Sequence, residues 1–257
     1  MKKIILQITL AIFIFWSCSK DDTSTIDNPT VDKSLNQKPT GSSSYDLLSA
    51  SNYTKLMLEI AYVEGYEPTQ SAINNLKTFL SNRLNKPAGI TVTTKSVPSL
   101  NSSPYSIQEI ADFEDANRTI YSSDNQIAVW AFFTDGKSDN DTSSGVVLGT
   151  AYRNTSFVIF ENTIHGLSDG TFEPDRDVLE STVIEHEFGH LLGLVNLGSD
   201  LQSDHEDTDH AKHCNVDTCL MYWAAETGKA IDNLASGGSI PQLDAQCIAD
   251  LQANGGK

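Results

Sequence analysis

Two histidines four residues apart, with a glutamate directly after the first, constrain this chain more than any other feature of its sequence. The motif is His186-Glu187-Phe188-Gly189-His190, and it lies in an apolar run at residues 178–195. Four residues are slightly more than one helical turn, so both imidazoles leave the same face of a helix and can bind one cation. The run is therefore predicted to form one amphipathic to buried helix that carries a metal site.

Glu187 has a different predicted role from the two histidines. It lies about 100° around the helix from His186, which suits a base acting on water better than a further ligand in the same plane. Two imidazoles on a zinc ion with an open position lower the pKa of bound water from about 15.7 to about 7. The motif therefore predicts zinc as cofactor and attack of water on a carbonyl, with a peptide bond as the favoured substrate.

A chance match is the alternative, because three fixed positions in five residues also occur in unrelated helices. Two later features argue against chance. Gly193 stands three residues after His190, where a left-handed residue can end the helix and turn the chain back. Met221 then follows His213 within a short segment that contains two cysteines.

Together these residues resemble the metzincin metallopeptidases, whose motif H-E-x-x-H-x-x-G-x-x-H is followed by a turn with a methionine beneath the zinc. They are most similar to the archaemetzincins, in which the third histidine is followed at once by C-x4-C-x-M, the spacing of His213, Cys214, Cys219 and Met221. The resemblance implies an α/β (α+β) fold with a mixed twisted sheet, packed helices, a zinc helix and an irregular C-terminal subdomain with the Met-turn. It also implies a zinc-dependent endopeptidase with Glu187 as its catalytic general base.

The chain departs from the metzincin pattern at the third zinc ligand. Asn196 stands where the family has its third histidine, and residues 197–212 look like an insertion. We predict His213 as the third ligand, because its distance to the turn methionine keeps the family spacing; His205 is the alternative and His210 follows. Asn196 is expected to cap the helix or to hydrogen-bond a ligand. The departure leaves a noncatalytic zinc-binding surface lipoprotein as the alternative function.

Three cysteines follow the zinc helix, namely Cys214, Cys219 and Cys247. In archaemetzincins a C-x4-C pair and a C-x2-C pair bind a second, structural zinc, but here Asp250 stands in place of the fourth cysteine. We predict one disulfide, most simply Cys214 to Cys219, over a second zinc, because an oxidising compartment favours the disulfide.

The first 18 residues predict export as a lipoprotein. Lys2 and Lys3 precede an apolar run at residues 4–16, which is too short to span a bilayer and is typical of a signal peptide. The run ends in a small residue and Cys18, which resembles a bacterial lipobox with Cys18 as the lipidated residue. Residues 19–22 resemble the signal that sends Bacteroidetes-type lipoproteins to the surface. The sequence therefore predicts an extracytoplasmic protein that is membrane-anchored at the outer membrane or cell surface.

Composition divides the remainder into two parts. Residues 19–50 are rich in Ser, Thr, Asp, Asn and Pro and are predicted to be a flexible tether. Residues 51–257 are predicted to form one metzincin-like catalytic domain. Its expected helices run from Thr69 or Ser71 to residue 83 and over residues 106–121, and its strands over residues 55–63, 90–97, 126–133, 146–151 and 156–160. The edge strand that would pair with an extended substrate is expected at residues 146–151 or 157–161.

The formal net charge of −17 argues against a nucleic-acid partner, because a polyanion would be repelled and no Lys/Arg cluster is present. The expected partners are a peptide or protein substrate and the membrane at the lipid anchor, and a monomer is favoured. The acidic segment at residues 200–209 is either a solvated loop or an auxiliary cation site. His165 is interpreted as a loop histidine, and Tyr222 or Trp223 is expected to line the cleft.

Overall fold

The computed structural model describes residues 31–257 except for residues 101, 144 and 228–237. The predicted signal peptide at residues 1–18, with Cys18, lies outside the described residues. Among the helices of the described residues, none is both long enough and apolar enough to cross a bilayer.

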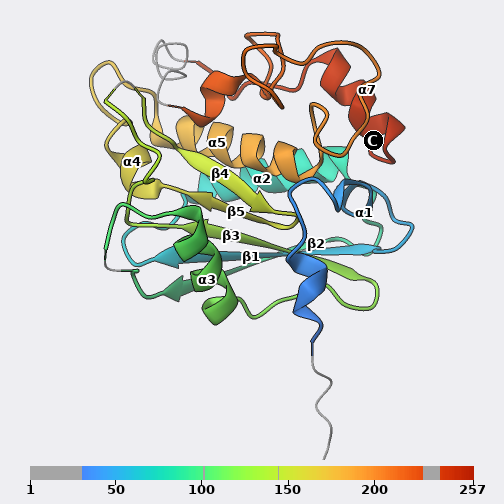
Figure 1. The fold of residues 1–257 in the computed structure, drawn as a ribbon, viewed down its shortest axis with the longest axis horizontal. Helices are drawn as coiled ribbons and strands as arrows, with labels where there is room; N and C mark the ends of the chain where they lie inside the picture. The colour runs from blue at the N-terminus through green and yellow to red at the C-terminus, as the bar shows by residue number, and fades with distance from the viewer. Residues whose placement is uncertain (1–30, 101, 144, 228–237) are drawn as a thin grey trace, which may run out of the picture. The chain divides into compact units, whose positions relative to one another are not determined.

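A five-stranded sheet with the order β2-β1-β3-β5-β4 forms the centre of the fold (Figure 1). Neighbouring strands are parallel except for β4, which pairs antiparallel with β5 at one edge. The strands are β1 (Lys55–Val63), β2 (Ile90–Val97), β3 (Gln126–Phe133), β4 (Gly149–Arg153) and β5 (Ser156–Ile159). The predicted mixed α/β fold is confirmed. Of the two predicted candidates for the edge strand, residues 146–151 correspond to β4, which lies at the edge but begins and ends a few residues later.

Helices cover both faces of the sheet, because β1 and β3 carry apolar side chains on both sides. One core joins Leu58 and Val129 to the helices α2 (Gln70–Arg83) and α5 (Arg176–Leu191). The other core joins Trp130 and Phe132 to α3 (Ile107–Asn117) on the opposite face (Figure 1). The remaining described elements are η1 (Lys33–Asn36), α1 (Ser44–Leu48), α4 (Glu161–His165), η2 (Trp223–Glu226) and α7 (Ala245–Ala253).

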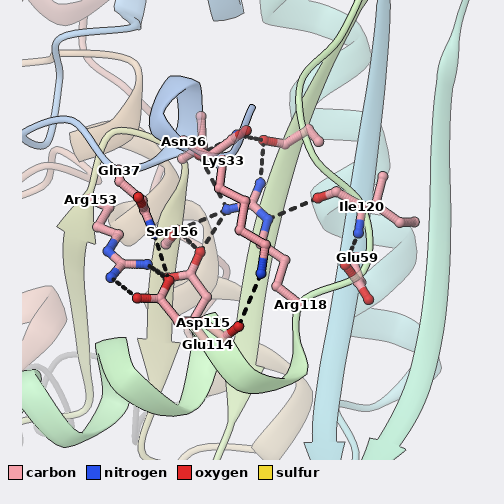
Figure 2. A network of polar contacts seen from close by, with 12 residues as sticks. Lys33, Asn36, Gln37, Glu59, Glu114, Asp115, Arg118, Ile120, Arg153 and Ser156 are labelled. Atoms are coloured by element: carbon pink, nitrogen blue, oxygen red, sulfur yellow. Dashed lines mark hydrogen bonds and ion pairs between the residues drawn. The ribbon is translucent and has the colours of Figure 1, made fainter. Parts of the chain in front are cut away.

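Capping residues set the bounds of the two predicted helices. Thr69 caps α2 with its side-chain oxygen, which accepts a hydrogen bond from Ala72 N at 3.2 Å, so the helix begins where predicted. α3 ends at Asn117, four residues before the predicted end. The carboxylate of Glu59 accepts hydrogen bonds from the backbone N–H groups of Thr119 and Ile120, which removes them from the helix (Figure 2).

The prediction of a tether over residues 19–50 is wrong for its second half, because the folded unit spans Val31–Lys257. Leu47 and Leu48 of α1 are fully buried in the core. The side chain of Asn36 is also buried, and its amide donates hydrogen bonds to Ser122 Oγ, Ala128 O and Thr155 Oγ1 at 2.8–3.0 Å. Polar residues here are satisfied by specific partners rather than by water, which composition does not reveal.

A polar network fastens this N-terminal segment to α3 and β4 (Figure 2). Asp115 of α3 accepts two hydrogen bonds from Arg153 of β4, at 2.7 and 3.0 Å, and one from Gln37 at 2.9 Å. Beneath it, Arg118 and Glu114 form a buried ion pair at 2.7 Å. Residues 31–50 are therefore an integral part of the domain.

Candidate metal centre

The helix α5 spans Arg176–Leu191 and so ends four residues before the predicted end at residue 195, but Gly193 turns the chain as predicted. Gly193 has a φ of +76°, and its N–H donates to His190 O at 3.0 Å while Leu194 N donates to Gly189 O at 3.1 Å. These two bonds are those of a Schellman motif with glycine in the left-handed position. They end the helix just after His190, so that both histidines lie in its last two turns and are buried.

The structure brings the three predicted zinc ligands together. The Nε2 atoms of His186 and His190 lie 3.1 Å apart. The ring of His213 returns from the loop, with its centroid 5.3 Å from that of His186 and 5.1 Å from that of His190. The possible ligand atoms of the three residues and of Glu226 all lie within 4.8 Å of one another.

The hydrogen bonds of these imidazoles suit a bound cation. His186 donates from Nδ1 to Leu220 O at 2.7 Å, and His213 donates from Nδ1 to Ala211 O at 3.1 Å, which leaves Nε2 of each ring as the ligand atom. His213 Nε2 is buried without a hydrogen-bond partner. Burial lowers the pKa of His190 to about 4, with its histidine neighbours adding to the shift, so this ring is neutral at pH 7. Two imidazoles oriented by backbone carbonyls, with a neutral third beside them, fit a divalent metal ion such as zinc.

Two glycines allow the close packing around this cluster. A Cβ on Gly189 would lie 2.3 Å from the sulfur of Met221, so the buried methionine packs directly against the helix between the two histidines. A Cβ on Gly149 would lie 2.8 Å from Cγ of Glu187, so the edge strand also approaches the helix closely. Met221 thus lies where a Met-turn is expected.

Glu187 lines a cavity of about 190 Å³ together with His190, His213 and Glu226. Its carboxylate is fully buried and neither oxygen has a hydrogen-bond partner. Burial and the nearby charge of Glu226 raise the pKa of Glu187 well above its usual range. An unpaired buried carboxylate beside three imidazoles is placed to take a proton once a cation offsets its burial.

Glu226, at the end of η2, is the member of the site that the sequence did not reveal. Its carboxylate oxygens lie 3.4 Å from His213 Nε2, 3.7 Å from His186 Nε2 and 3.8 Å from His190 Nε2. Burial opposes the charged form of Glu226, but these three contacts outweigh it and hold the pKa of Glu226 well below its usual range. No motif spacing marks this residue. The backbone bond from Leu148 N to Glu226 O, at 2.9 Å, holds the end of η2 beside the edge strand.

Asn196 lies outside the metal cluster. Its amide donates to Glu206 Oε2 at 3.2 Å, and the other oxygen of Glu206 accepts a hydrogen bond from Lys212 N at 2.8 Å. Asn196 therefore does not cap the helix. It supports the inserted segment directly before His213.

His205, the alternative zinc ligand, lies in a second cluster instead. Its Nδ1 is 3.5 Å from Cys214 Sγ and 4.0 Å from Cys247 Sγ, and Cys247 Sγ is 3.6 Å from Cys219 Sγ. Its Nε2 donates to Asp250 Oδ2 at 2.8 Å. The residue in place of the fourth cysteine, Asp250, thus orients a histidine from the insertion.

The predicted Cys214–Cys219 disulfide differs from the structure, in which Cys214, Cys219 and Cys247 are all free and buried. Hydrogen bonds from Cys214 and Cys247 lower the pKa of Cys219, which favours a thiolate in the cluster. The ligand atoms of His205, Cys214, Cys247 and Asp244 lie within 4.8 Å of one another, and Cys219 adjoins Cys247. Sulfur and nitrogen donors gathered in this way suit a structural zinc site. The spacing of three cysteines could not show that a histidine completes it.

The remaining candidates lie away from the metal cluster. His210 hydrogen-bonds Asp207 at 3.0 Å and stacks on Trp223, with ring centroids 4.2 Å apart. Neither Tyr222 nor Trp223 lines the cavity beside Glu187, in contrast to the prediction. Apart from His205, no residue of the acidic segment 200–209 belongs to a group of possible metal ligands among the described residues.

The sequence matches no known family model and no curated protein. The structure, however, is similar to the crystal structure of archaemetzincin from Methanopyrus kandleri at 1.5 Å resolution, with a TM-score of 0.51 and 18% sequence identity. The similarity covers 78% of this chain and 96% of the archaeal chain. The chain therefore has an archaemetzincin-like fold.

Proposed function

We propose that this protein is a zinc-dependent endopeptidase with His186, His190 and His213 as zinc ligands and Glu187 as general base. The observation that carries the proposal is the convergence of three imidazoles on one point beside a buried glutamate whose oxygens have no hydrogen-bond partner. The archaemetzincin-like fold supports the same function.

Zinc, when bound, polarises a carbonyl group and makes water acidic enough to lose a proton near neutral pH. Glu187 accepts that proton at its carboxylate and donates it to the leaving amine. Leu220 O and Ala211 O hold the rings of His186 and His213 in the orientation that ligation needs.

An extended peptide would bind along the edge strand β4, because Thr150 and Ala151 line the same cavity as Glu187. Part of this edge is already covered. Thr40 donates to Ala151 O at 3.3 Å, and Thr227 pairs with Val147 just before the strand. The substrate therefore has to fit a short length of free edge, which favours peptides or unfolded segments over folded proteins.

The second candidate function is a noncatalytic zinc-binding surface protein, and Glu226 is the observation that favours it. A carboxylate that faces all three imidazoles can complete a four-ligand site, and closed tetrahedral sites are structural rather than catalytic. In the endopeptidase, Glu226 has to leave this position when substrate or water binds.

We further propose a second, structural zinc held by Cys214, Cys219, Cys247 and His205, with Asp250 orienting the histidine. The proposed protein is a monomeric lipoprotein, anchored through Cys18 at the outer membrane or cell surface, that acts outside the cytoplasm and binds no nucleic acid. The N-terminal sequence and the negative charge support this location and choice of partners.

The decisive experiment compares Glu187→Gln with His186→Ala. Glu187→Gln should retain the zinc of the wild type and lower cleavage of a peptide library by about two to four orders of magnitude, because only proton transfer is removed. His186→Ala should lose that zinc as well. Full hydrolysis by Glu187→Gln would contradict the assigned role.

A further inference from the structure

We propose that Glu161, His165 and Glu180 form a site for a divalent cation that accepts oxygen and imidazole ligands, such as Zn²⁺ or Mn²⁺. The site is separate from the histidine cluster and from the cysteine cluster. It joins the short helix α4 to the first half of α5.

The three side chains are arranged as ligands of one ion. Glu161 and His165 are four residues apart on α4 and leave the same face, while Glu180 comes from α5. Their possible ligand atoms all lie within 4.8 Å of one another, with 3.2 Å between His165 Nε2 and Glu161 Oε1. The sequence suggested only a loop histidine at position 165, because its partner Glu180 is distant along the chain.

The ring of His165 is held in place from its other face. It stacks on Tyr66 with ring centroids 5.3 Å apart, and the hydroxyl of Tyr66 accepts a hydrogen bond from Asn162 at 3.1 Å. The imidazole therefore has a fixed orientation toward the two carboxylates, as a preformed ligand requires.

The two carboxylates are buried with most of their oxygens unsatisfied. Glu161 and Glu180 are both 0% exposed. Neither oxygen of Glu161 has a hydrogen-bond partner, and the same holds for Glu180 Oε1. Only Glu180 Oε2 is satisfied, by Thr69 N at 2.8 Å. Three buried carboxylate oxygens without partners are costly, and a bound cation removes that cost.

Arg176 is the only cationic side chain in contact with this group among the described residues, and it does not satisfy the carboxylates. Its Nη1 lies 3.1 Å from His165 Nε2, while its Nε is 3.5 Å from Glu180 Oε1 and makes no hydrogen bond. A guanidinium that neutralised the pair would form two parallel short bonds to one carboxylate. The Arg176 side chain is 35% exposed, so it can turn outward and leave His165 Nε2 free for an ion.

Protons are the competing occupants of this site. Burial raises the pKa of Glu161 to about 7 and that of Glu180 to about 8, so without a metal the two carboxyls together hold more than one proton at pH 7. A proton shared between the two carboxyls satisfies one contact, whereas a divalent ion contacts both carboxylates and the imidazole together. The donor set of two carboxylates and one imidazole therefore favours the cation.

Zinc content measured by mass spectrometry tests the proposal on the full chain. The wild type, Glu180→Gln and His165→Asn are saturated with zinc, unbound zinc is removed, and the zinc bound per chain is measured. The matched control is Glu185→Gln, which changes another buried glutamate of α5 outside the cluster. The two variants should hold one zinc fewer per chain than the wild type and the control. Equal zinc content in all four proteins would overturn the proposal.

Crystals of the wild-type protein soaked in Mn²⁺ give a second test that does not depend on the folding of variants. Anomalous scattering should place an ion between Glu161, His165 and Glu180. Absence of that peak, with the two carboxyls in direct contact, would show a proton-sharing pair and overturn the proposal. Neither test measures peptide hydrolysis, so failure of the cation-site proposal can be told apart from failure of the endopeptidase proposal.

Discussion

Met221 lies so close to Gly189 that a side chain on the glycine would come within 2.3 Å of the methionine sulfur. The glycine occupies the helix between His186 and His190, and the methionine is fully buried beneath them. The position of both rings therefore depends on the absence of a methyl group at residue 189.

Gly189→Ala is expected to destabilise the protein. Alanine in a helix interior is normally favoured over glycine by about 1 kcal/mol, but overpacking a buried contact costs about 1–3 kcal/mol. Since the new methyl group would lie well inside van der Waals contact with the Met221 sulfur, we expect a net loss of about 1–2 kcal/mol and weaker zinc binding. Chemical denaturation and zinc titration measure both effects.

Gly166→Ala is the matched control for this substitution, because a Cβ there meets no atom closer than 3.5 Å. It should leave the free energy of unfolding unchanged within about 0.5 kcal/mol. Wild-type stability and zinc affinity in Gly189→Ala would show that Met221 is free to move and does not support the zinc ligands.

Glu226→Gln is expected to separate the two candidate functions. The amide is a poorer zinc ligand than the carboxylate, and it removes the charge that faces His186, His190 and His213. In the endopeptidase it should raise the rate of peptide cleavage severalfold while zinc remains bound. Cleavage assays and zinc titration should be run together with Thr227→Ser as a control next in the chain.

The opposite result in Glu226→Gln has an equally definite meaning. If zinc affinity falls by about tenfold or more and no peptide is cleaved by either protein, Glu226 is a structural ligand. The noncatalytic zinc protein would then be the better description of this chain.

His205→Ala should remove one zinc per chain and leave the zinc at His186 in place. Asp250→Asn should keep the second zinc but weaken its binding by about 10–100-fold, because the amide orients the imidazole less well. His210→Ala is the control from the same insertion and should keep both ions. Measuring bound zinc and titrating free thiols together distinguishes this site from a disulfide. With a disulfide, one thiol would remain reactive, and the wild type would hold no zinc at the cysteine cluster.

The parts of the fold that the sequence predicted are those with local signals. The strands at residues 55–63, 90–97 and 126–133 have their predicted bounds because alternating or continuous apolar character ends at turn residues. The histidine pair follows from helical spacing. The structure also brings His213 to that pair. This was predicted from the spacing between His213 and Met221, which matches a known motif.

What the sequence did not reveal depends on contacts between distant residues. Asn36 looks like part of a polar tether, yet its side chain satisfies three buried groups more than eighty residues away. His205 completes a cysteine cluster only after the insertion folds back, and Glu226 reaches the imidazoles from a segment without a motif. Such positions follow from the assembled fold, not from composition or periodicity.

A pH-dependent stability is expected from Glu185, which lies on α5 beside a cavity of about 130 Å³ that Arg83 also lines. Burial raises its pKa from 4.5 to about 7, against the opposing effect of Arg83. Between these two values the folded state holds one more proton than the unfolded state, so unfolding releases a proton and stability falls as the pH rises. The shift corresponds to at most about 3 kcal/mol at pH above 7.

Glu185→Gln lacks this ionisation, so the variant should be about 1–3 kcal/mol more stable than the wild type at pH 8 and equal to it at pH 4. Urea denaturation at several pH values, with the exposed Glu64→Gln as control, measures the difference. A constant difference across the pH range would mean that Glu185 stays ionised and is stabilised by Arg83 instead.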